Sequence, residues 1–188
     1  MIFTQPDFLS DAEFNTLNKS MTEQCNQIKS QPNQSSTYNW IGQYQGLNDG
    51  DLTMVAMRFG KHVPQIINKI SNYLNTCIDT VPKVSTVSYC YAVKEYEAPY
   101  HKGLLLSSTT QKEASRIYKA FIFAHKTWEN TWGGKLNIKE ETIHQFIPLS
   151  NLLVIFSLDH EYEVTKITDL AKDNTRMLFS VKFGKERV

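Results

Sequence analysis

Apolar residues recur at three- and four-residue spacing in the first part of the chain, which is the pattern of an amphipathic helix. Ser10 followed by Glu13 has the form of a capping box, so we expect the first helix to cover about residues 10–28. Its apolar face consists of Phe14, Leu17, Met21, Cys25 and Ile28. A second apolar stripe predicts a helix over about 54–78, with Pro64 near an internal boundary.

From residue 84 onwards, short runs of alternating or continuous apolar residues replace the helical pattern, as is typical of strands. The predicted strands are residues 84–93, 117–125, 136–138, 145–149, 152–158, 163–167 and 176–183. The polar stretch 30–53 predicts a loop or a weak hairpin. Helices followed by many short strands indicate an α+β fold, with two or three helices packed on the outside of a jelly roll. We expect a single domain over 1–188, in which 1–83 is helical support and 84–188 forms the β core.

Composition narrows the classes of function. The 188 residues suit one domain with a sizeable core, and the formal net charge of +1 gives no reason to expect nucleic acid as a partner. Cys25, Cys77 and Cys90 have neither metal-ligand spacing nor a disulfide framework, so we expect free thiols in a reducing compartment. No signal peptide opens the chain and no apolar run is long enough to span a membrane, which predicts a cytoplasmic protein. The oligomeric state stays open.

Candidate chemistry lies where predicted strands end. Residues two apart in a strand share a face, so His101 would share one with Gly103, and His160 would share one with Tyr162 if the strand extends that far. Arg176 begins a third row. If these rows face the interior of the barrel, imidazoles with open coordination positions suit a mononuclear iron site. The guanidinium suits a small dicarboxylate, because arginine binds carboxylates through two parallel hydrogen bonds.

Several segments together resemble one family. They are residues 7–10, 96–101, 128–136 with its Gly-Gly-x-Leu motif, 147–156 with Pro-x-x-Asn-x-x-Val-x-Phe, 163–167 and 176–183. Together they resemble the iron(II)/2-oxoglutarate-dependent oxygenases of the prolyl-4-hydroxylase-like branch, including short phage-encoded members. The resemblance implies a double-stranded β-helix with iron(II) and 2-oxoglutarate as cofactors. It implies His101 and His160, or alternatively Tyr162, as metal ligands, with Arg176 and Tyr96 at 2-oxoglutarate. For a phage-encoded chain it also implies a virion component.

The chain departs from the family's pattern at three positions. The first ligand motif, His-x-Asp, reads His101-Lys102-Gly103, so Gly103 stands where the carboxylate is missing. The slot of the second histidine holds Tyr162, while His160 lies two residues earlier. The Arg-x-Ser pair reads Arg176-Met177-Leu178, which keeps the guanidinium and loses the hydroxyl.

Two interpretations follow from these departures. In the first, Gly103 opens an iron position that an anion such as chloride fills, as in family members that halogenate. An active protein would then hydroxylate or halogenate an unknown substrate while 2-oxoglutarate is decarboxylated. In the second, the site is lost and the fold serves as a structural, assembly or binding module. Individual residues also have structural alternatives: Tyr162 would pack in the barrel mouth, and Arg176 would pair with Asp169 or Asp173.

Overall fold

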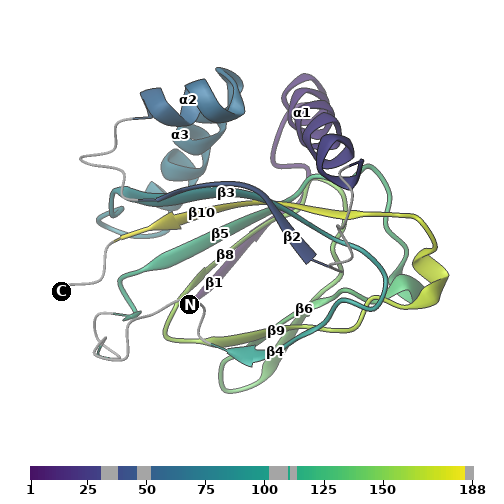
Figure 1. The fold of residues 1–188 in the computed structure, drawn as a ribbon. Coiled ribbons are helices and arrows are strands. Elements are labelled where there is room, and N and C mark those ends of the chain that lie inside the picture. The colour runs from purple at the N-terminus through teal and green to yellow at the C-terminus, as the bar shows by residue number, and fades with distance from the viewer. Residues whose placement is uncertain (31–37, 46–51, 102–109, 111–113, 185–188) are drawn as a thin grey trace.

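Two antiparallel sheets face each other, and three helices cover the outer face of the larger one (Figure 1). This computed structural model describes residues 1–30, 38–45, 52–101, 110 and 114–184. The larger sheet has the order β1 (Ile2–Gln5), β8 (Leu153–Ser157), β5 (Tyr118–Phe123), β10 (Arg176–Phe183), β3 (Val84–Ala92), β2 (Tyr38–Gln45). The smaller sheet has the order β4 (Ala98–His101), β9 (Glu161–Val164), β6 (Leu136–Lys139), β7 (Ile143–Phe146). The helices are α1 (Asp11–Lys29), α2 (Thr53–Phe59) and α3 (His62–Asn75), and short 3₁₀ turns lie at Asn130–Trp132 and Asp169–Ala171.

The predicted α+β jelly roll is confirmed. Eight strands follow residue 84 in the described part of the chain, and the strand pairings there are antiparallel. Two strands begin two residues earlier than the sequence predicted. The strand expected at 145–149 is β7 at Ile143–Phe146, and the strand expected at 163–167 is β9 at Glu161–Val164. The N-terminal part also contributes β1 and β2 to the larger sheet, so it supplies strands as well as helices.

The predicted helix over 54–78 is two helices, because Gly60 interrupts it. Gly60 has φ +103°, a conformation that side-chain-bearing residues rarely adopt. A Cβ atom there would lie 2.8 Å from the imidazole of His62. The chain therefore turns between α2 and α3, and the apolar stripe of α3 packs on the larger sheet.

The larger sheet is buried on both faces, because its strands alternate. On β10, Phe179 and Val181 pack with the helices, whereas Leu178 packs in a second cluster between the sheets. On β5, Phe121 and Phe123 belong to that inner cluster. We call the face of the larger sheet that looks toward the smaller sheet the inner face, and the space between the sheets the lumen.

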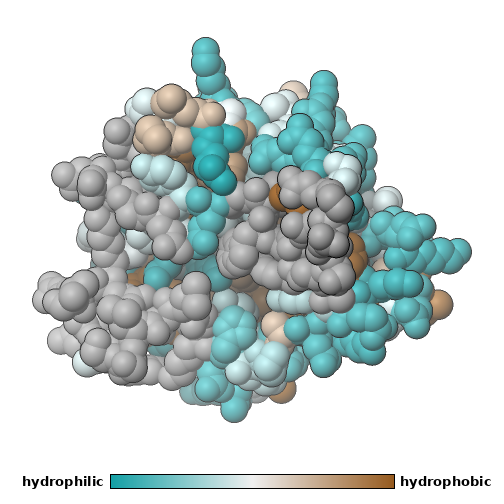
Figure 2. Space-filling view, viewed as in Figure 1, coloured by the Kyte–Doolittle hydropathy of each residue, from teal (hydrophilic) through white to brown (hydrophobic). Residues whose placement is uncertain are grey.

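The described surface is mainly hydrophilic on the side that Figure 2 shows, with a more hydrophobic patch toward the upper left, where Figure 1 places α2. That helix leaves Met54 and Met57 exposed. None of the described helices combines the length and the apolar character needed to cross a bilayer.

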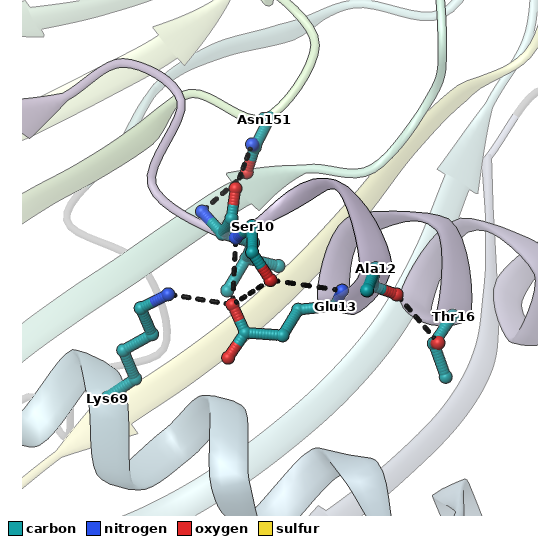
Figure 3. A network of polar contacts seen from close by, with 7 residues as sticks. Ser10, Ala12, Glu13, Thr16, Lys69 and Asn151 are labelled. Atoms are coloured by element: carbon teal, nitrogen blue, oxygen red, sulfur yellow. Dashed lines mark hydrogen bonds and ion pairs between the residues drawn. The ribbon is translucent and has the colours of Figure 1, made fainter.

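The predicted capping box at the start of α1 is confirmed (Figure 3). The Ser10 amide donates to Glu13 Oε2 at 2.8 Å, and the Glu13 amide donates to Ser10 Oγ at 3.4 Å. Lys69 on α3 donates to the same carboxylate at 2.7 Å and so joins the two helices. This hydrogen bond, followed by the one from the Ser10 backbone, lowers the pKa of Glu13 to about 2.

Asn151 attaches the segment before α1 to the start of β8. It is 7% exposed and has φ +60°. Its Oδ1 accepts from the Leu9 amide at 2.9 Å, and its Nδ2 donates to the Leu9 carbonyl at 2.7 Å (Figure 3). The Asn151 carbonyl also accepts from the Phe8 amide at 3.1 Å. One side chain thus satisfies two buried backbone groups in a conformation that asparagine tolerates better than most residues.

Replacing Asn151 tests this attachment. Asn151→Ala should lower the free energy of unfolding by about 2–4 kcal/mol, because two buried hydrogen bonds are lost and alanine is strained at positive φ. Asn151→Gly loses the same hydrogen bonds without the strain, so its loss should be smaller by about 1 kcal/mol. Urea unfolding of the three proteins measures both differences. Equal stabilities of the alanine and glycine variants would contradict the role of the backbone conformation.

Candidate functional site

His101 and Tyr162 face each other across two strands of the smaller sheet. His101 is the last residue of β4 and stands directly opposite Tyr162 on β9. The ring centroids are 4.3 Å apart. Tyr162 is 4% exposed and packs against Phe121 and Phe156 of the inner cluster. The structure therefore brings His101 together with the residue that occupies the slot of the second histidine.

Lys119 places a positive charge beside this pair. It lies on β5 on the inner face, and its ammonium group donates a hydrogen bond to the hydroxyl of Tyr162 at 2.9 Å. The same group lies 5.2 Å from the centroid of the Tyr162 ring. Burial of the imidazole, and secondarily the charge of Lys119, lower the pKa of His101. His101 is therefore neutral at neutral pH.

Sequence reasoning missed Lys119. The signal was present, because residues two apart in a strand share a face. Lys119 stands in one row with Phe121 and Phe123, so an alternating strand places its side chain toward the lumen. A lysine in an otherwise apolar row of a strand buried on both faces marks a polar site.

His160 lies elsewhere, in the turn before β9. The strand begins at Glu161, so the condition that it extend back to His160 is not met. The Nε2 atom of His160 lies 3.1 Å from Glu140 Oε1 and also contacts the amino group of Met1. Gly103 falls outside the described residues. Among the residues that the structure describes, no group of three or more His, Cys, Asp or Glu side chains is arranged to hold a metal ion.

The donor set that the described residues provide around His101 does not fit a ferrous ion. Such sites use imidazole and carboxylate ligands, whereas here one imidazole is accompanied by a phenol and an ammonium group. Glycine at position 103 has no side-chain donor to add. A dication about 4 Å from the ammonium group would be repelled by roughly 8 kcal/mol at an effective dielectric constant near 20. We therefore derive no reaction step through iron.

Arg176 and Tyr96 lie at the other end of β10. Arg176 is 2% exposed, and its guanidinium carbon lies 5.2 Å from the centroid of the Phe123 ring on the inner face. A Cβ atom on Gly134 would lie 3.3 Å from the Arg176 side chain, so the glycine makes room for it. Burial raises the pKa of Tyr96, and the charge of Arg176 opposes that rise. The structure therefore places Tyr96 near Arg176.

The sequence also offered Asp169 and Asp173 as partners of Arg176, and the exposure of these residues differs from that of the arginine. Asp169 and Asp173 are exposed, whereas Arg176 is enclosed. Its guanidinium lies against the Phe123 ring, and its side chain passes close to Gly134.

His125 is a structural histidine. It is 3% exposed, its Nδ1 accepts from the Met177 amide at 3.3 Å, and its Nε2 lies 2.6 Å from the Pro148 carbonyl. Because Nδ1 accepts, Nε2 carries the proton and donates it. Burial, together with the charge of Arg176, lowers the pKa of His125 to about 4 although both hydrogen bonds oppose the change.

This histidine should make stability depend on pH. Above its unfolded pKa of 6.5, His125 is neutral in both states and its contribution is complete. As the pH falls from 6.5 to about 4, the unfolded chain binds the proton first, so on the order of 3 kcal/mol of stability is lost. Urea unfolding at several pH values should show a shallower loss for His125→Gln than for the natural chain. The other histidines are common to both proteins, so identical pH slopes would contradict this role.

The charge of Lys119 should be measurable at His101. Lys119→Met removes the cation and should raise the pKa of His101, which a proton NMR titration of the imidazole can follow. Lys61→Met is the matched control, because Lys61 is exposed at the start of α3 on the other side of the larger sheet. An unchanged pKa of His101 in Lys119→Met would show that the two side chains are not neighbours in solution.

The fold has known relatives in three dimensions. No protein-family model and no curated protein matches the sequence. A prolyl-4-hydroxylase from Pseudomonas putida superposes with a TM-score of 0.68 at 14% identity, covering 99% of this chain and 93% of the other. A prolyl hydroxylase from Trichoplax adhaerens, in complex with a hypoxia inducible factor peptide, gives 0.67 at 12% identity, with coverages of 97% and 83%.

A viral example also matches. The collagen prolyl hydroxylase of Paramecium Bursaria Chlorella virus-1, in complex with 2OG, gives a TM-score of 0.63 at 13% identity and covers 98% of this chain and 96% of its own. At sequence identities this low, the superpositions are evidence for a shared fold alone. The chain has the double-stranded β-helix fold of the 2-oxoglutarate-dependent iron(II) oxygenases, in the form found in prolyl-4-hydroxylases.

Proposed function

We propose that this chain is a non-catalytic protein of the oxygenase fold, which binds a small carboxylate ligand in its lumen and does not use iron. One observation carries the proposal: the ammonium group of Lys119 lies 2.9 Å from the hydroxyl of Tyr162, beside the imidazole of His101. A fixed cation therefore stands next to His101 and Tyr162, two of the three residues that the family resemblance offers as iron ligands. The binding-module interpretation of the sequence accounts for this arrangement better than an oxygenase with an open iron position does.

Arg176 supports the carboxylate part of the proposal. A guanidinium offers two parallel N–H donors that match a carboxylate. Arg176 is buried on the inner face, where the missing side chain of Gly134 accommodates it. We propose 2-oxoglutarate or a dicarboxylate of similar length as the ligand, with Tyr96 beside it. The viral collagen prolyl hydroxylase, a match at the level of the fold, was solved as a 2OG complex.

The remaining residues of the site would bind and orient the ligand and would not take part in a reaction. Lys119 holds the hydroxyl of Tyr162 as an acceptor, and the neutral imidazole of His101 packs against the same ring. The arrangement suits recognition of an anion.

Iron titration under anaerobic conditions tests the first half of the proposal. We expect no ferrous binding by the natural chain, no charge-transfer absorption with 2-oxoglutarate, and no succinate in air. His101→Ala should behave identically. A triple variant with Gly103→Asp, Lys119→Met and Tyr162→His restores the family's donor set and serves as the positive control. If this variant binds iron and the natural chain does not, the assay can detect such a site. Ferrous binding by the natural chain that disappears in His101→Ala would refute the proposal.

Calorimetry with 2-oxoglutarate in the absence of metal tests the second half. The natural chain should bind it, and Arg176→Met should weaken binding on the order of 100-fold, because truncating a buried charge partner costs about 2–5 kcal/mol. Arg176→Lys keeps the charge and loses the two-donor geometry, so its affinity should fall between those of the other two proteins. Equal affinities of all three would exclude Arg176 as the carboxylate partner.

A further inference from the structure

A polar groove runs beside α1, outside the lumen. Three adjacent cavities of about 560, 420 and 350 Å³ form it. The first two share Asn18, Thr22 and Lys126 in their linings, and the second shares Asn174 with the third. We call these three cavities the helix groove. It lies on the helix side of the larger sheet, since Met177, which lines the second cavity, packs with the helices.

Uncharged polar side chains of α1 line the first two cavities. Asn15, Asn18, Thr22 and Asn26 follow one another at spacings of three, four and four residues. Side chains at these spacings lie on one face of a helix, so they form a continuous stripe. Amide and hydroxyl groups both donate and accept hydrogen bonds, which suits a neutral polar ligand.

The stripe is long enough for an extended chain. Lys29 ends it and donates to Thr175 Oγ1 at 2.6 Å, which joins the helix to the opposite wall. From residue 15 to residue 29, an α-helix rises about 21 Å. An extended peptide covers this length with about six residues, at roughly 3.3 Å per residue.

Asn18 presents a hydrogen-bond acceptor in this groove. It is 8% exposed, and its Nδ2 donates to the Ala124 carbonyl at 2.7 Å. Because a carbonyl can only accept, the amide is oriented unambiguously and Oδ1 remains as its acceptor. Among the residues that the structure describes, none donates to this oxygen. Asn18 lines both larger cavities, so a donor for Oδ1 has to come from a ligand or from water.

The charges around the helix groove nearly balance. They are Lys19, Lys29, Lys126 and Lys172 against Glu23, Glu129 and Asp173. Such a balance does not suit a polyanion. Lys126 lines both larger cavities and has no ion-pair partner within the described part of the chain. The groove therefore offers a place for a single carboxylate beside Lys126.

The third cavity is more apolar. Leu170 is 61% exposed there and lines the cavity together with Trp132, whose ring packs edge-on against Trp128 at 5.4 Å. These two side chains suit an apolar side chain of a ligand. In the described linings of the two larger cavities, the imidazole of His125 is the only ring. A sugar chain would need ring faces along its whole length, so a peptide fits the groove better.

We propose that the helix groove binds an extended peptide segment of about six residues from a partner protein. An amide side chain has one donor group and one acceptor, the same pair that a peptide group presents, so Asn18 and Asn26 would bind the main chain. One acidic side chain of the segment lies at Lys126, and an apolar one lies against Trp132 and Leu170. The site is separate from the lumen and independent of the proposed function.

Two blocked hexapeptides are the probes: acetyl-Ala-Ala-Glu-Ala-Ala-Leu-amide and the reversed acetyl-Leu-Ala-Ala-Glu-Ala-Ala-amide, one for each chain direction. In NMR titrations of the natural chain, at least one should bind with a dissociation constant of about 1 mM or lower. The shifted resonances should include the side-chain amides of Asn18 and Asn26 and the backbone amide of Lys126. No binding of either peptide, or shifts confined to other residues, overturns the proposal. Shifts at these positions caused by maltohexaose and not by the peptides also overturn it.

Exposed residues of the groove allow variants that leave the core intact. Asn26→Leu should weaken binding of the better peptide about threefold to tenfold, because neutral hydrogen bonds are lost. Lys126→Glu should weaken it about fivefold and should bind the peptide with Gln in place of Glu as the natural chain does. Lys61→Met is the control, since Lys61 lines none of the three cavities. Undiminished binding by both groove variants contradicts the site.

A parallel series with 2-oxoglutarate separates the groove from the lumen. Asn26→Leu and Lys126→Glu should bind 2-oxoglutarate as the natural chain does, and Arg176→Lys should bind the peptide unchanged. Peptide binding that is lost in Arg176→Lys would place the peptide in the lumen and overturn the groove. Absence of 2-oxoglutarate binding by the natural chain would refute the carboxylate site, while the peptide titrations would still decide on the groove.

Discussion

The larger sheet is buried on both faces, and the rest of the structure depends on this constraint. Its strands must present apolar side chains to the helices on one side and to the lumen on the other. Desolvation makes any charged side chain on the inner face costly unless it meets a partner. Arg176 and Lys119 are therefore informative positions, because they retain charge where packing alone would favour aliphatic residues.

The two apolar clusters also explain how the fold can persist without a metal centre. Phe179 packs against the helices and Phe156 packs between the sheets, and neither cluster is organised by His101. A barrel stabilised in this way tolerates replacement of metal ligands at its mouth. The ring of Tyr162 even adds apolar contacts with Phe121 and Phe156 at the slot of the second histidine. Loss of iron and retention of fold are thus compatible.

Polar side chains inside the structure are used mainly to satisfy backbone groups. Asn151 forms hydrogen bonds with the amide and carbonyl of Leu9. His125 forms hydrogen bonds with the Met177 amide and the Pro148 carbonyl. Each joins segments that are distant in the sequence. Lys119 differs from these residues, because its hydrogen-bond partner is the side chain of Tyr162 in the lumen. Lys119 therefore contacts another side chain of the lumen, whereas Asn151 and His125 support the backbone.

Periodicity by itself determined the class of fold, the strand at 176–183 and the capping box of α1, because alternation and capping are local properties of the chain. Periodicity placed Arg176 and Tyr162 in rows of a shared face, and the tertiary structure turned those rows toward the lumen. Only the tertiary structure decided that β9 starts after His160, since that boundary follows from pairing with β6 and β4. Likewise, the meeting of Lys119 with Tyr162 joins strands of different sheets, and its pairing with Lys182 depends on register across β5 and β10. Such contacts arise from packing between distant segments, which no local pattern encodes.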